Sequence, residues 1–132
     1  MKKTFILIIS VLALTACHHE TIEERAKRET KEYTQKYCPT PFINYTRTDS
    51  MTFENSNRTI IYYCSFSDKM DNAEIINKNN KKIIDGLKKG IADNTGIKNY
   101  IEAGLNFRYV VHSHNNPQEV LFKHDFNNKE VK

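Results

Sequence analysis

Apolar residues recur with two different periods along most of this chain, and the two periods predict its secondary structure. Residues 20–37 and 71–90 carry apolar side chains every three or four positions, which is typical of amphipathic helices. Four other segments alternate between apolar and polar positions, as strands do, and they span residues 46–54, 58–66, 105–112 and 120–126. The predicted order of the main elements is therefore α-β-β-α-β-β.

The two predicted helices differ in how their ends are marked. The first has a narrow apolar stripe that includes Tyr33 and Tyr37, and Pro39 ends it because proline cannot donate to the helical hydrogen-bond ladder. The second opens with Asp71 followed three residues later by Glu74, a pattern similar to a capping box. Residues 97–101 are expected to add one short helical turn.

The four strands are expected to form two hairpins. Residues 55–57 (Asn-Ser-Asn) separate the first two strands, and residues 115–117 (Asn-Asn-Pro) separate the last two. In the first strand, simple alternation places Asp49, Met51 and Phe53 on one side. An isolated hairpin is marginally stable in water, so both should join one sheet.

These elements predict an α+β fold, with a four-stranded antiparallel sheet and two main helices packed on one face. The opposite face would carry threonine, serine, arginine and tyrosine, and would be left for solvent or for a partner. Residues 127–132 are polar and are expected to fray.

The start of the chain has the features of a bacterial lipoprotein precursor. Two lysines precede an uncharged apolar run at residues 5–14, which is a signal-peptide pattern and is too short to span a membrane. Residues 14–17 (Leu-Thr-Ala-Cys) look like a lipobox, in which cleavage exposes Cys17 and the cysteine is acylated. Two or three acyl chains would hold the protein on a membrane. The alternative is a buried cysteine in an ordinary signal peptide.

This interpretation divides the chain into a signal peptide (1–16), a lipidated tether (17–20), one α+β domain (21–126) and a C-terminal tail (127–132). By resemblance to the enterobacterial sorting rule, in which Asp after the lipidated cysteine retains a lipoprotein at the inner membrane, His18 favours the periplasmic side of the outer membrane. The inner membrane is the alternative.

Composition limits the classes of partner. Removal of residues 1–16 from the 132-residue chain leaves 116 residues, enough for one compact core. Loss of Lys2 and Lys3 lowers the formal net charge from +4 to +2, and the remaining basic residues are interleaved with acidic ones. Nucleic-acid binding is therefore not expected.

Two cysteines, Cys38 and Cys64, remain once Cys17 carries lipid. The signal peptide would place them in a compartment where disulfides persist, and a bridge between them would stabilise the fold by about 3 kcal/mol. The alternative is that Cys64 is a small buried apolar residue.

The sequence also resembles a family of small uncharacterised bacterial envelope proteins, many of them lipoproteins or secreted. The resemblance rests on residues 46–50 (Thr-Arg-Thr-Asp-Ser), on Tyr62-Tyr63 and on residues 104–110 (Gly-Leu-Asn-Phe-Arg-Tyr-Val), and it covers residues 41–126. The chain departs from the family at residues 115–117, where such proteins often have a glycine turn. The resemblance implies an α+β fold and no named activity.

No enzyme, metal or cofactor signature is evident. His112 and His114 share a strand face but His124 falls too far along the sheet to join them, so surface histidines are favoured over a zinc or copper site. His18 and His19 lie on the expected tether and offer no complete ligand set. Neither remaining cysteine has neighbours that would lower its pKa, and no carboxylate pair, serine elbow or phosphate-binding loop is present. No cofactor is expected.

The residues that favour protein binding are Arg47, Tyr63 and Arg108, because arginine and tyrosine are enriched at interface hot spots and these three fall on predicted strands or their edges. For Tyr62 and Tyr109 we favour packing in the core. The main hypothesis is a non-enzymatic, lipid-anchored module that binds another envelope protein through one sheet face. The alternative is a periplasmic inhibitor or immunity-type protein that blocks a lytic enzyme with the turn at 55–57 or at 115–117.

Overall fold

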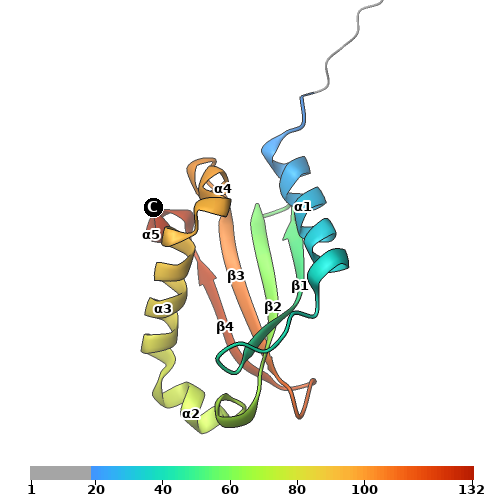
Figure 1. Ribbon diagram of the computed structural model, residues 1–132. Coiled ribbons are helices and arrows are strands. Elements are labelled where there is room, and N and C mark those ends of the chain that lie inside the picture. Colours follow the sequence, from blue (N-terminus) through green and yellow to red (C-terminus); the bar gives the residue numbers. More distant parts are fainter. Residues whose placement is uncertain (1–18) are drawn as a thin grey trace, which may run out of the picture.

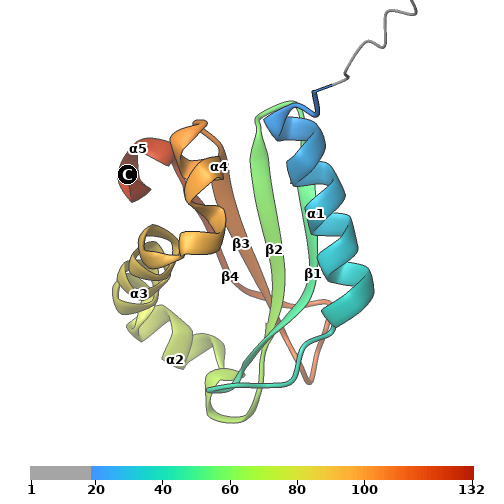
Figure 2. The ribbon, with the colours of Figure 1, turned by 45° about the horizontal axis from the view of Figure 1, so that its top comes forward.

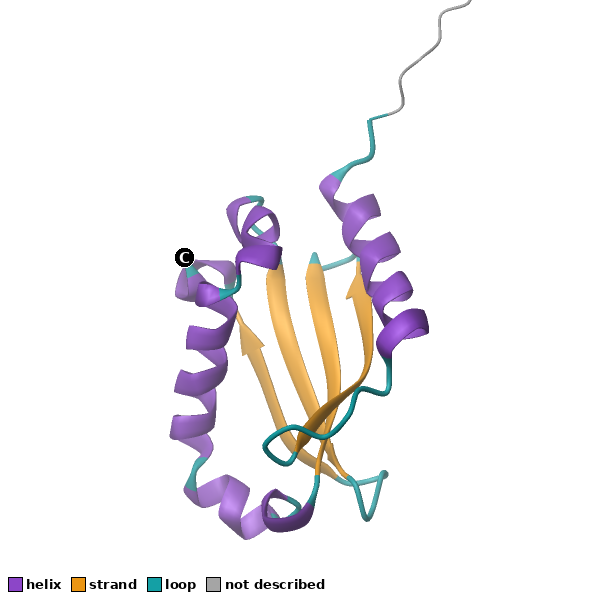
Figure 3. Ribbon diagram, in the orientation of Figure 1, coloured by secondary structure: helices purple, strands orange, loops and turns teal. Residues whose placement is uncertain are grey.

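The computed structural model describes residues 19–132 (Figure 1). In this range the chain forms one sheet and five α-helices, and the helices and the sheet occupy separate layers (Figure 3). The strands are β1 (Thr46–Glu54), β2 (Thr59–Phe66), β3 (Asn106–Ser113) and β4 (Val120–Phe126). The helices are α1 (Ile22–Tyr37), α2 (Ala73–Lys78), α3 (Asn80–Asp93), α4 (Lys98–Glu102) and α5 (Asn128–Val131). The α+β class and the four-stranded sheet are confirmed.

The sheet is mixed, and the prediction of an all-antiparallel sheet was wrong. Its strand order is β1-β2-β3-β4, with antiparallel pairs at both edges and a parallel pair, β2 and β3, in the centre. The chain leaves β2 at one end of the sheet and returns through α2, α3 and α4 before β3 begins. Such a crossover lets the next strand run in the same direction as the previous one.

Helix α1 ends where the sequence predicts, and a capping box that the sequence analysis did not note marks its start. Thr21 and Glu24 form a reciprocal capping box, with hydrogen bonds of 2.9 and 3.1 Å between each side chain and the other residue's backbone N–H. The helix ends at Tyr37, before Cys38-Pro39. Thr34 Oγ1 accepts a 2.8 Å hydrogen bond from the Met51 N–H and so fixes the helix against β1.

The predicted helix over residues 71–90 is two helices, which corrects the sequence interpretation. Asn72 caps α2 by accepting a 3.1 Å hydrogen bond from the Ile75 N–H, whereas Asp71 bonds the N–H of Asn115 instead. The backbone leaves helical geometry at Asn79, and α3 then continues past Gly90 to Asp93. The break lets Ile76 pack in one hydrophobic cluster while Ile91 packs in another.

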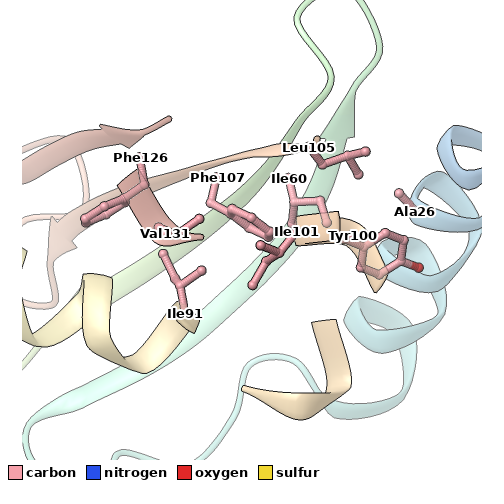
Figure 4. Packing of buried hydrophobic residues seen from close by; sticks show 9 residues of the cluster. All are labelled: Ala26, Ile60, Ile91, Tyr100, Ile101, Leu105, Phe107, Phe126 and Val131. Carbon is pink, nitrogen blue, oxygen red and sulfur yellow. The ribbon is translucent and has the colours of Figure 1, made fainter. Parts of the chain in front are cut away.

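The main core lies between the helices and one face of the sheet. Phe107 and Phe126 are inaccessible to solvent there, and Ala26 of α1 and Ile91 of α3 join the same cluster (Figure 4). Both main helices therefore pack on one face, as the sequence predicts. A second cluster, around Phe66, Ile76 and Phe122, fills the end of the sheet near α2.

The C-terminal segment is ordered into α5, so the expectation of a frayed tail was wrong. Val131 is only 3% exposed and belongs to the main core. Asn128 Nδ2 donates a 2.5 Å hydrogen bond to the Ile101 carbonyl, and the Asn128 N–H donates a 3.0 Å bond to Asn106 Oδ1. The sequence interpretation missed this because one apolar residue among polar ones gives no period. Within residues 19–132, no helix combines the length and the apolar character needed to cross a bilayer.

Candidate functional site

Two pockets lie on the helix-covered face of the sheet, one lined by residues of α1 and α4 and the other by residues of α3, and we call the strip of sheet that runs from one to the other the groove. Figure 2 shows the backbone of α1 apart from those of α3 and α4 over this face. The floor of the groove is made by Tyr62 of β2 and Tyr109 of β3, which are register partners in the parallel pair. Their rings stack with centroids 4.6 Å apart and planes within 6° of parallel. Both tyrosines are only half-buried, so the floor is aromatic and partly accessible.

At the α4 end the groove holds a pocket of about 270 Å³. Tyr33 of α1 and Ile97 lie on its two sides, and Met51 and Tyr62 lie on its floor. The Tyr100 hydroxyl donates a hydrogen bond to the Glu29 carboxylate and so joins α4 to α1 at this end. Burial, followed by this hydrogen bond, raises the pKa of Tyr100, which keeps its hydroxyl protonated at neutral pH.

At the α2 end the groove widens into a pocket of about 510 Å³. Ile83, Gly86 and Leu87 present one side of α3 to it, while Cys64 and Tyr109 lie on its floor. Gly86 has no heavy atom within 4 Å of the position that a Cβ would occupy. The space beside α3 is therefore wide enough to accept an apolar side chain from another molecule.

Several exposed apolar residues lie near this end of the groove. Asn44 lines the wide pocket, and its neighbours Ile43 and Tyr45 are 70% and 40% exposed. Asn44 and Tyr45 have positive φ angles of 51° and 64°, and the Ser67 N–H donates a 2.9 Å hydrogen bond to the Tyr45 carbonyl. The loop is thus held against the end of β2 while its apolar side chains remain accessible.

Burial keeps two titratable side chains of the groove floor protonated at neutral pH. Burial raises the pKa of Tyr62 to about 12 and that of the Cys64 thiol to about 12. Burial, with the nearby negative charge of Asp49, also raises the pKa of Cys38. A thiol with a raised pKa is a weak nucleophile at neutral pH.

Both cysteines are free thiols in the structure. Cys38 caps the C-terminus of α1 and Cys64 is buried in β2, and each lies close enough to Asp49 for its charge to affect the thiol. A bridge between them stays a prediction for the oxidised protein. Cys17 and His18 lie outside the described residues, so lipidation also stays a prediction.

The residues that the sequence singled out for partner binding share the opposite, open face of the sheet. Arg47 forms a 2.7 Å ion pair with Asp49, and Arg108 is paired with Asp125 and lies 3.6 Å from Glu54. Tyr63 lies on the strand between them, on the same face. The structure therefore brings the three residues onto one surface, and their role in binding stays a prediction.

The histidines at and beside the strands divide between the two faces of the sheet. His112 and His114 line one depression on the open face, whereas His124 is the register partner of Tyr109 and packs against Phe126 with ring centroids 4.6 Å apart. Among residues 19–132, no group of three or more histidine, cysteine or acidic side chains is arranged to hold a metal ion.

The turn at 115–117, one of two considered as an inhibitory probe, is tied to the body of the protein. The Asn115 N–H donates a 2.9 Å hydrogen bond to Asp71, and the Asn116 N–H donates one of 2.9 Å to Ser113 Oγ. These bonds order an exposed turn, and its role as an inhibitory probe stays a prediction.

Tyr62 and Tyr109 pack against both hydrophobic clusters, as the sequence interpretation favours, but that interpretation did not anticipate the pockets beside them. The sequence feature that could have indicated an uncovered strip of sheet was the narrow apolar stripe of α1. A narrow stripe covers little of the sheet, and Tyr33 and Tyr37 at its end remain 38% and 61% exposed.

Comparison with protein families gives one match. The model for a domain of unknown function (DUF8479) matches residues 21–122, which is most of the chain. The chain belongs to this family. No curated protein matches the sequence.

Solved structures share the fold of this DUF8479 member. A candidate secreted protein from Pseudomonas aeruginosa superposes with a TM-score of 0.70 at 15% identity, covering 83% of this chain and 92% of the other. The type 2 secretion system pilotin EpsS from Vibrio vulnificus gives a TM-score of 0.63 at 8% identity, covering 83% and 91%. The type II secretion system pilotin AspS from Vibrio cholerae gives 0.59 at 12% identity, covering 82% and 90%. At these identities the likeness concerns the fold.

Proposed function

We propose that this protein is a non-enzymatic, lipid-anchored module of the cell envelope that holds an amphipathic helical segment of a partner protein in the groove between α1 and α3. The observation that carries the proposal is the groove itself, with its stacked Tyr62 and Tyr109 floor and a pocket at each end. A helix can lay apolar side chains at helical spacing into two such pockets.

The groove suits a helical occupant because its accessible surface is apolar and its rims are polar. Glu29 and Asn94 border the α4 end, and Asn44 and Lys82 border the α2 end. An amphipathic helix would bury one stripe on the tyrosines and keep its charged side exposed between the rims.

The location rests on the N-terminal sequence and is supported by the fold. A lipid on Cys17 would attach the domain to a membrane through a short tether that leads into α1. Two proteins with this fold are pilotins of type II secretion systems, and a third is a candidate secreted protein. We infer an envelope protein as partner, and favour the periplasmic side of the outer membrane because His18 follows the cysteine.

Site-specific photocrosslinking in cells tests the proposal. A photoreactive phenylalanine analogue would replace Tyr33 in the groove, Tyr63 on the open face, or Gly90, which is exposed on α3 and outside the groove. We expect one dominant envelope protein, identified by mass spectrometry, to crosslink from Tyr33 and not from Gly90. Crosslinking from Tyr63 alone would move the contact to the open face, and a captured cell-wall hydrolase would favour the inhibitor alternative.

A matched pair of substitutions tests the groove without weakening the fold. Gly86→Leu adds a side chain inside the wide pocket, whereas Gly90→Leu adds the same side chain outside it, and both sites have open space. Both changes replace glycine within a helix by a better helix former. Gly86→Leu should abolish the crosslink and Gly90→Leu should preserve it. Cys17→Ala should keep the folded domain and lower crosslinking by releasing it from the membrane.

A further inference from the structure

The open face of the sheet contains a pocket that the proposed function does not use. It has a volume of about 440 Å³, within the range of small-ligand sites. Its lining includes Arg47, Asp49, Tyr63, Ser65 and His112. These side chains alternate with the groove residues along their strands, so the pocket and the groove lie on opposite faces.

Two β-bulges at the same level of the sheet build this pocket. One lies between Thr48 and Ser50 of β1, and the other lies opposite the step from Val111 to His112 of β3. The first leaves Asp49 as an extra residue and sends both Asp49 and Ser50 to the open face. Bulges redirect side chains in this way and are common beside functional sites.

Hydrogen bonds within the pocket hold Arg47 in place. Asp49 accepts a 2.7 Å bond from Arg47 Nε at one carboxylate oxygen and a 2.5 Å bond from Ser65 Oγ at the other. The guanidinium also lies over the Phe42 ring, 4.7 Å from its centroid. Within residues 19–132 the two terminal nitrogens of Arg47 have no hydrogen-bond partner, so they remain available to a ligand.

His112 supplies a second group, which lacks a hydrogen-bond partner. It is the register partner of Ser65 on the neighbouring strand and lines the same pocket. Its Nδ1 atom is buried and has no hydrogen-bond partner among the described residues. A buried polar atom in a native protein is normally paired, so an unpaired one in a pocket points to a ligand.

We propose that this pocket binds a carboxylate group, carried by a small organic acid or by the C-terminus of a peptide. Three kinds of group from residues that line the pocket can donate hydrogen bonds: the Arg47 terminal nitrogens, a His112 ring nitrogen and the Tyr63 hydroxyl. Paired guanidinium N–H groups fit the two oxygens of a carboxylate. Asp49 does not compete with the ligand, because both of its oxygens accept bonds within the pocket and its charge is offset by Arg47.

The test follows histidine ring resonances by NMR in the full-length lipoprotein in detergent micelles. The probes are acetyl-Ala-Ala with a free C-terminal carboxylate, the same dipeptide as its C-terminal amide, and propionate. We expect the free dipeptide or propionate to shift the His112 ring resonances with a Kd on the order of 1 mM, and the amide to have no effect. Binding of the dipeptide alone identifies a peptide C-terminus, and equal binding of both acids identifies a small organic acid.

Arg47→Gln should weaken binding at least about tenfold, and Arg47→Lys, which keeps the charge without the paired N–H groups, should weaken it less. Arg28→Gln is the matched control, because Arg28 is also ion-paired but lies on α1 away from the pocket. Circular dichroism confirms folding of each variant. The proposal is overturned if neither acid shifts His112, if the amide binds as well as the acid, or if both folded Arg47 variants bind as the unsubstituted protein does. These outcomes are independent of crosslinking at the groove.

Discussion

The two faces of the sheet carry different kinds of side chain and hold them by different interactions. On the helix side, Phe107 and Phe126 are inaccessible and pack against α1, α3 and α5 residues in one cluster. On the open side, the neighbouring residues of the same strands form ion pairs, such as Arg108 with Asp125. The first face stabilises the fold through burial of apolar area, and the second is ordered by polar contacts that contribute little to stability.

This difference also separates the two candidate sites. The groove is lined mainly by apolar side chains, so it suits a protein segment that buries area on the tyrosines. The pocket around Arg47 and His112 is lined mainly by residues that carry polar groups, so it suits a small charged group. The same strands can serve both because successive side chains point to opposite faces.

The largest expected contrast between the faces comes from the main core. Phe107→Ala removes a side chain that is 0% exposed and should lower the free energy of unfolding by about 3–5 kcal/mol. Urea unfolding followed by circular dichroism measures the loss. A change below about 1 kcal/mol would show that the helix layer does not pack on β3 as described.

The burial of Tyr62 on the groove floor should affect the stability of the protein in alkaline solution. The folded pKa of Tyr62 is raised by burial to about 12, above the unfolded value of about 10. The stability that comes from the raised pKa of Tyr62 is therefore fully present below pH 10. It is lost as the pH rises from about 10 to 12, because the tyrosine of the unfolded state releases its proton first. Tyr62→Phe should leave the free energy of unfolding almost unchanged at pH 8. As the pH rises from about 10 to 12, the variant should lose about 2–3 kcal/mol less stability than the unsubstituted protein.

Urea unfolding at a series of pH values measures this effect, and Tyr37→Phe is the control because Tyr37 is 61% exposed. Parallel alkaline profiles for Tyr62→Phe and the unsubstituted protein would mean that the Tyr62 hydroxyl is fully hydrated. The groove would then be wider than the stacked tyrosines indicate.

The strands could be located from the sequence, but their arrangement could not. Alternation of apolar and polar residues over 46–54 and 120–126 reproduces the bounds of β1 and β4. The parallel pairing of β2 with β3 depends on where the chain returns after α4, and no local pattern encodes that. A bulge also leaves no local signal, which is why alternation grouped Asp49 with Met51 and Phe53 although Asp49 faces the opposite side.

The candidate sites were predictable only in part. Arg47, Tyr63 and Arg108 do share one face, because their strands were assigned correctly. The groove depends instead on the distance between α1 and α3, which is set by packing of residues far apart in the sequence. Its floor residues look like ordinary core positions until the width of the uncovered strip is known.

The C-terminal helix gives a smaller test of the helix-side core. Val131→Ala should lower the free energy of unfolding by about 1–2.5 kcal/mol, because it removes two methyl groups from a side chain that is 3% exposed. Lys129→Ala, on the exposed side of α5, is the control. If both variants unfold at the same urea concentration as the unsubstituted protein, the tail frays as its polar sequence suggested.

The smallest effect is expected on the open face. Arg108→Ala removes a partly exposed pair with Asp125 and should cost about 0.2–1 kcal/mol at pH 7. The hydrogen bond from Arg108 lowers the pKa of Asp125, so the contribution is present above the ordinary value of about 4 and is lost as the pH falls below it. The difference in the free energy of unfolding between Arg108→Ala and the unsubstituted protein should therefore shrink in acid and in high salt.

A cost that exceeds about 2 kcal/mol and is unchanged by salt would mean that Arg108 acts mainly by covering Ile61, its register partner, which is 6% exposed. The open face would then contribute to the core as well as to binding, and the contrast between the two faces would be one of degree.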